Sequence, residues 1–168
     1  MKNYFQLVFK YNFKKEHQNT ASIKPIDDSS KIATKLDFEP IYIKSNLFYL
    51  YYQLFSYLCF RANFKKKVKK IKNGDIVFIQ YPIYATYRFG NTLEFILSYF
   101  KKRGIHTIGL VHDIENLRNF DEKKLRKEIQ FLNSFSYLIV HNDKMKSILR
   151  DYGLSIKTTS LNIFDYEI

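Results

Sequence analysis

The sequence predicts an α/β fold, namely a Rossmann-like, doubly wound, mostly parallel sheet of about six strands. Two observations carry this prediction. Short apolar segments alternate with helical segments, which implies parallel pairing through βαβ crossovers. Four of the expected strands are almost continuously apolar, as is typical of strands buried on both faces. The 168 residues are one domain's length, since domains usually run to about 100–200 residues. We therefore expect a single domain over residues 1–168.

The first half of the chain is expected to alternate strand, helix, strand and a longer helix. The corresponding ranges are 4–9, 31–36, 38–43 and 45–72. Asp27 or Asp28 would cap the first helix, because a short acidic side chain accepts hydrogen bonds from free helix N–H groups. In the longer helix, leucines recur at three- and four-residue spacing. That helix should end by Gly74, a residue that commonly follows a helix.

The second half is expected to continue the alternation. Strands are predicted at 75–80, 105–111, 137–141 and 158–163, and helices at 91–102, 121–133 and 143–152. Gly104 and Gly153 mark the ends of two of these helices. Residues 112–118 read as a loop after the fourth strand. No G-x-G-x-x-G turn and no G-x-x-x-x-G-K-[ST] loop is present, which argues against a dinucleotide cofactor and against a nucleoside triphosphatase.

Positive charge is concentrated in the first part of the chain. The formal net charge is +12, and residues 1–72 hold 15 Lys or Arg against 5 Asp or Glu. The densest segment, Lys65–Lys72, is either a solvated helix end or a contact for an anionic partner. Residues 45–60 carry no charge but are too few to span a bilayer, which needs about 20. Residues 45–72 could thus form a core or subunit-interface helix, or contact a membrane peripherally.

Other residue types exclude several classes of protein. The single Cys59 forms no internal disulfide and no zinc–thiolate cluster, and the four histidines show no metal-ligand spacing. We expect no metal and no cofactor. The amino terminus lacks the apolar core and cleavage site of a secretory signal. The expected location is the cytoplasm, with peripheral contact to the inner face of the cell membrane as an option.

The candidate site lies where the predicted strands end, because ligands of open α/β sheets bind beyond the carboxyl ends of the strands. Gln80 and Tyr81 end the third strand, and His141 with Asn142 ends the fifth. His112 and Asp113 follow the fourth strand. A histidine beside a carboxylate suits a base near neutral pH. The alternative is structural, with Asp113 capping the loop or the next helix.

Several segments, in order, resemble the amino-terminal half of bacterial sugar transferases of the galactofuranosyltransferase and glucosyltransferase-like group. Asp75–Pro82 and Gly109–Arg118 carry the resemblance most clearly. Further similar stretches are 21–28, 128–145 and 163–166. One departure is Leu36-Asp37-Phe38, where the family pattern has a glycine in the middle.

The resemblance implies the amino-terminal, acceptor-side domain of a GT-B fold. Such an enzyme transfers a sugar, here galactofuranose or glucose, from a nucleotide-sugar to a glycan or lipid-linked acceptor, without a metal. The carboxyl-terminal donor-binding domain of the family lies outside residues 1–168. This chain would therefore work with a partner domain or as a homo-oligomer.

The same resemblance assigns roles to residues. His112 or Asp113 would remove the proton of the acceptor hydroxyl. Lys24 and the loop with Asn19 and Thr20 would help to hold the leaving diphosphate. The remaining substrate contacts would orient sugar hydroxyls or an acceptor phosphate, and they are Gln80, Tyr81, Arg118 and Asn142.

Two alternatives belong to other classes of protein. The chain could be a non-catalytic half that works only by assembling with a partner. It could also be a basic nucleic-acid-binding module that contacts phosphates through residues 61–72. No recognised nucleic-acid motif is present, and the lysines are not interleaved with stacking residues. We therefore expect no nucleic-acid partner.

Overall fold

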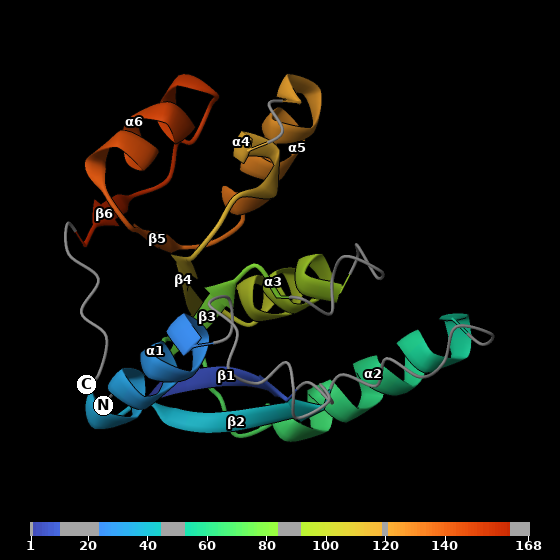
Figure 1. The fold of residues 1–168 in the computed structure, drawn as a ribbon. Coiled ribbons are helices and arrows are strands. Elements are labelled where there is room, and N and C mark those ends of the chain that lie inside the picture. The colour runs from blue at the N-terminus through green and yellow to red at the C-terminus, as the bar shows by residue number, and fades with distance from the viewer. Residues whose placement is uncertain (1, 11–23, 45–52, 84–91, 119–120, 162–168) are drawn as a thin grey trace.

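The computed structural model describes residues 2–10, 24–44, 53–83, 92–118 and 121–161. These residues form one six-stranded sheet in the order β2-β1-β3-β4-β5-β6, in which all neighbouring strands are parallel (Figure 1). The strands are β1 Tyr4–Lys10, β2 Glu39–Lys44, β3 Ile76–Tyr81, β4 His106–Val111, β5 Tyr137–Val140 and β6 Thr158–Ser160. The helices are α1 Lys24–Lys35, α2 Gln53–Lys67, α3 Thr92–Lys102, α4 Glu115–Arg118, α5 Glu122–Leu132 and α6 Asp143–Asp151.

The predicted Rossmann-like α/β fold is confirmed. The chain runs from β1 outward to β2, then returns past β1 to β3 and proceeds in the opposite direction to β6. The order of the strands therefore reverses between β1 and β3. In open parallel sheets a ligand crevice forms at such a reversal, beyond the carboxyl ends of the strands.

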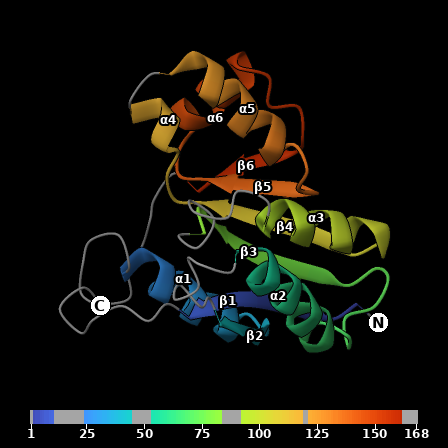
Figure 2. The ribbon, with the colours of Figure 1, turned by 90° about the vertical axis from the view of Figure 1, so that its right-hand side faces the viewer.

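The sheet separates two apolar clusters. The larger cluster joins one face of the strands to α2, α3, α5 and α6, with Phe64, Phe100 and Ile129 at most 1% exposed. The smaller cluster lies on the other face, where Ala33 of α1 packs with Phe78 and Leu110. Figure 2 shows α2 and α3 side by side against the sheet. Burial on both faces explains why the central strands β3, β4 and β5 are largely apolar.

Several predicted elements differ from the structure. The helix predicted to run to residue 72 ends at Lys67, and the last strand, predicted to run to residue 163, ends at Ser160. Helix α1 begins at Lys24, so that Asp27 lies in its first turn rather than before it. The helical pattern is hidden because the buried side of α1 includes the polar residues Asp28 and Ser29. Within residues 112–118, predicted as a loop, α4 forms a single turn. One turn is too short to display a helical period.

Helix α1 ends in a left-handed residue. Asp37 has φ 62°. The N–H of Phe38 donates to Ala33 O at 3.0 Å, and the N–H of Asp37 donates to Thr34 O at 3.1 Å. This is the Schellman arrangement, which satisfies free carbonyls at a helix end and usually places glycine at the left-handed position. Asp37 therefore occupies a backbone position that favours glycine.

We expect Asp37→Gly to stabilise the protein by about 0.5–1 kcal/mol, because glycine adopts positive φ without a steric cost. Urea denaturation measures the change. Lys35→Gly is the matched control, since Lys35 has helical backbone geometry and glycine there should destabilise by a similar amount. A loss of stability in Asp37→Gly would contradict the assignment of this turn.

Candidate active site at the carboxyl edge of the sheet

The end of β3 sends neighbouring side chains to opposite faces of the sheet. Gln80 lies on the face that α1 covers, and Tyr81 belongs to the larger apolar cluster on the other face. This follows from the two-residue period of a strand. The two predicted site residues therefore face different surroundings, although they are adjacent in sequence.

The amide of Gln80 joins three segments of the chain. Its Nε2 donates to Ile26 O at 3.0 Å and to Ser30 Oγ at 2.8 Å, both in α1. Its Oε1 lies 2.7 Å from Nε2 of His112, directly after β4. Gln80 is only 7% exposed. A buried amide needs such partners, because an unsatisfied polar group in the interior costs about 1–3 kcal/mol.

These contacts determine which nitrogen of His112 carries the proton. Ile26 O is a carbonyl that only accepts, so the amide group of Gln80 must point Nε2 toward α1 and Oε1 toward His112. An amide oxygen also only accepts. His112 is therefore the donor, with the proton on Nε2, and Nδ1 is the basic nitrogen of the ring.

The surroundings keep the His112 ring neutral. Burial lowers the pKa of His112 from 6.5 to about 4, with a further contribution from the charge of His141. The two imidazole rings lie 5.9 Å apart between centroids. Burial disfavours the charged form of histidine. The main chain also holds His112 at this position, because its backbone N–H donates to Tyr81 O at 2.7 Å.

Asp113 lies next to His112 and leads into α4. Its Oδ1 accepts from the Ile114 N–H at 2.9 Å. The side chain of Asp113 is half-buried, whereas Ile114 is 1% exposed and belongs to the apolar core. A short polar turn, anchored by one buried residue, thus holds a carboxylate at the carboxyl edge.

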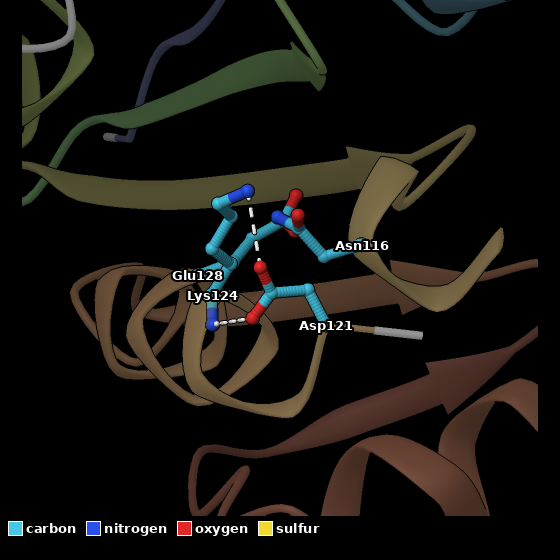
Figure 3. A network of polar contacts seen from close by, with 4 residues as sticks. All are labelled: Asn116, Asp121, Lys124 and Glu128. Carbon is cyan, nitrogen blue, oxygen red and sulfur yellow. Dashed lines mark hydrogen bonds and ion pairs between the residues drawn. The ribbon is translucent and has the colours of Figure 1, made fainter. Parts of the chain in front are cut away.

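On the opposite face, Tyr81 takes part in a second polar contact. Its hydroxyl donates to one carboxylate oxygen of Glu128 in α5, and Asn116 Nδ2 in α4 donates to the other at 2.7 Å. Figure 3 shows Asn116 and Glu128 beside the pair of Asp121 and Lys124. Asp121 caps α5, accepting from Lys124 N at 3.0 Å. The hydrogen bond from that N–H holds the pKa of Asp121 below its ordinary value.

The structure places the other predicted residues as follows. Asn142 caps α6, with its Oδ1 accepting from Met145 N at 2.8 Å, directly after His141. Lys24 is exposed at the start of α1. Arg118 ends α4, but its side chain is not among those described. Asn19 and Thr20 lie outside the described residues. The substrate contacts assigned to these residues stay predictions.

Several residues at this edge were not predicted from the sequence. Ser30 and the Ile26 carbonyl hold Gln80, and Glu128 joins Tyr81 to Asn116. A second buried amide also binds α1, since Nε2 of Gln6 in β1, a residue at 1% exposure, donates to Ser30 O at 3.0 Å. A glutamine inside an otherwise apolar strand is the signal that could have indicated these contacts. In the described part of the chain, no cluster of three or more His, Cys, Asp or Glu residues could hold a metal ion.

Comparison with known families agrees with this architecture. A family model described as "Glucosyltransferase 3-like, N-terminal domain" matches residues 8–163. The fold and this match define a glycosyltransferase-like amino-terminal domain. The chain belongs to the glucosyltransferase 3-like N-terminal domain family. No curated protein matches the sequence.

The neutral state of His112 predicts an acid-dependent loss of stability. The folded pKa of about 4 lies below the unfolded value of about 6.5. Below pH 6.5, His112 is protonated in the unfolded chain but stays neutral in the folded chain. The contribution of His112 to the stability of the fold is therefore fully present above pH 6.5 and is lost as the pH falls toward 4. Between pH 7 and pH 5 the loss should be roughly 2 kcal/mol.

Urea denaturation of the wild type and of His112→Gln at both pH values isolates this contribution. We expect the difference in stability between the two proteins to change by that amount from pH 7 to pH 5. His106→Gln is the control, because His106 is exposed on β4. An unchanged difference for His112→Gln would show that the ring is not held neutral.

Proposed function

We propose that this chain is the acceptor-side domain of a GT-B glycosyltransferase. The observation that carries the proposal is the family match over residues 8–163, nearly the whole chain. The polar residues at the carboxyl ends of β3 and β4 support it, because this is the edge where parallel α/β sheets bind ligands. The reaction would transfer glucose or galactofuranose from a nucleotide-sugar to a glycan or lipid-linked acceptor.

Asp113 is the proposed base. The acceptor hydroxyl oxygen attacks the anomeric carbon, its proton passes to the Asp113 carboxylate, and the bond from that carbon to the diphosphate oxygen breaks. The diphosphate leaves with the electron pair. Asp113 suits this role because its carboxylate is half-buried and its orientation is set by the Ile114 N–H.

His112 is the proposed positioning residue. Its Nε2 proton is directed to Gln80, and its Nδ1 is buried. In this proposal the imidazole ring does not contact the substrate. It positions the loop that carries Asp113. Lys24, exposed at the start of α1, would lie on the donor diphosphate, and Arg118 and Asn142 would orient hydroxyl groups. The donor itself would be held mainly by a second Rossmann-like domain.

Activity is tested by a turnover screen with a panel of nucleotide-sugars. The chain is assayed alone and after addition of a donor-binding domain from a glycosyltransferase of the same family. Sugar transfer in either mixture, dependent on this chain, supports the proposal. If the chain associates with the added domain but no donor is consumed, the domain is a non-catalytic assembly half and the proposal is wrong.

Substitutions then separate the two roles. In the active mixture, Asp113→Asn should lower turnover by about 10²-fold or more, the usual scale of base catalysis, with little change in Tm. His112→Gln should lower both turnover and Tm. Asp151→Asn is the matched control, since Asp151 is exposed at the end of α6. Near-normal turnover in Asp113→Asn would remove Asp113 from the mechanism.

A further inference from the structure

Helices α2 and α3 form a surface that the proposed reaction does not use. Phe64 of α2 contacts the rings of Phe95, Tyr99 and Phe100 of α3, with centroids 5.6–5.8 Å apart. A groove of about 430 Å³ lies between α2 and α3, next to these aromatic contacts. Its lining includes Tyr57, Arg61 and Lys65 of α2 and Glu94, Phe95 and Lys102 of α3.

Cations dominate the carboxyl-terminal half of this surface. Residues 61–72 contain seven Lys or Arg and no Asp or Glu, and α3 ends at Lys101 and Lys102. Some cations serve the fold. Lys67 donates to Tyr42 O, Lys70 pairs with Glu39, and Arg103 donates to Ile71 O. Five of the remaining cations, the exposed Lys65, Lys66, Lys69, Lys101 and Lys102, form what we call the basic face.

The basic face adjoins an exposed uncharged strip of the same helix. Leu58 is 52% exposed, and Cys59, Ala62 and Asn63 are also exposed. Spacing of three and four residues places Leu58, Ala62 and Lys66 in one row along α2. From Gln53 to Lys67 the helix contains no acidic residue. The row therefore passes from apolar to cationic along one side of the molecule.

We propose that this surface docks on an anionic lipid bilayer, with the basic face on the headgroups and Leu58 at their boundary with the acyl chains. Lysines near an anionic membrane surface each strengthen binding, by about fivefold. Contact would be peripheral, because no described helix is long and apolar enough to cross a membrane. This inference concerns where the domain works and goes beyond the proposed reaction.

A nucleic acid fits the same surface less well. Single strands bind by stacking bases on open aromatic rings. Here the Arg61 guanidinium already covers the rings of Phe95 and Tyr57, at 4.6 and 5.5 Å from their centroids. A phosphate backbone also offers nothing to an exposed leucine. The combination of apolar and cationic side chains is typical of helices that lie in a membrane interface.

Docking here would leave the candidate active site accessible. Each connecting helix runs from the carboxyl edge of the sheet back to its amino edge, so the ends of α2 and α3 lie near the amino edge. The N–H of Gly74 donates to Gly104 O at 2.9 Å, which joins the two segments that follow these helices. His112 and Asp113 lie at the opposite edge, after β4.

Vesicle co-sedimentation tests the proposal. The full chain is mixed with phosphatidylcholine vesicles containing one-third phosphatidylglycerol, and with pure phosphatidylcholine vesicles. We expect binding to the anionic vesicles only, and its loss when salt is raised from roughly 0.1 to 0.5 M, because added salt shortens the Debye length. Equal binding to both vesicles, or none to either, would overturn the proposal.

Variants locate the surface. Replacing Lys65, Lys66 and Lys69 together by Gln should weaken vesicle binding at least tenfold, and Leu58→Gln should weaken it severalfold. The matched control replaces Lys123, Lys127 and Lys144 by Gln, which removes the same charge from exposed positions on α5 and α6. Equal losses in the two triple variants would indicate a net-charge effect and contradict this surface. Single-stranded RNA that displaces the vesicles, and whose binding is insensitive to Leu58→Gln, would assign the surface to nucleic acid instead.

Discussion

The amide of Gln80 is the interaction on which the carboxyl edge depends. It lies in an apolar strand, 7% exposed, and it reaches α1 through Ile26 and Ser30 and the loop after β4 through His112. Leaving this buried amide without partners would destabilise the fold by more than a typical hydrogen bond stabilises it. The position of α1, the tautomer of His112 and the course of the loop with Asp113 are therefore set together by one side chain.

The direction of the parallel strands places the proposed sugar transfer and the proposed membrane docking at opposite edges of the sheet. Strand carboxyl ends gather the polar residues after β3, β4 and β5, whereas helix carboxyl ends gather Lys65, Lys66, Lys101 and Lys102 near the other edge. Lysines at a helix carboxyl end also complement the helix dipole. The favourable interaction with the helix dipole accounts for some of the lysines at the carboxyl ends of α2 and α3. It does not require the exposed Leu58 or a helix without acidic residues, which is why we assign a partner to this surface.

Most of the fold could be predicted from the sequence because buried parallel strands are apolar on both faces. The start of α1 could not, because its buried side includes Asp28 and Ser29 and shows no apolar stripe. The sequence marks Gln80 and His112 as special, and the structure brings them together. It does not reveal that Gln80 binds Ile26 and Ser30, which lie 54 and 50 residues away in the chain. Contacts of that separation follow from strand order and register rather than from any local pattern.

The tautomer and charge of the His112 ring show most directly whether Gln80 holds it as described. Correlation of imidazole protons with ring nitrogens by NMR, with His112→Gln used for assignment, reports both. We predict a neutral ring with the proton on Nε2 at pH 7, and the same neutral signal at pH 5.5, above the pKa of about 4. A proton on Nδ1, or an imidazolium at pH 5.5, would contradict this prediction, because Gln80 would then not hold His112 in the way described.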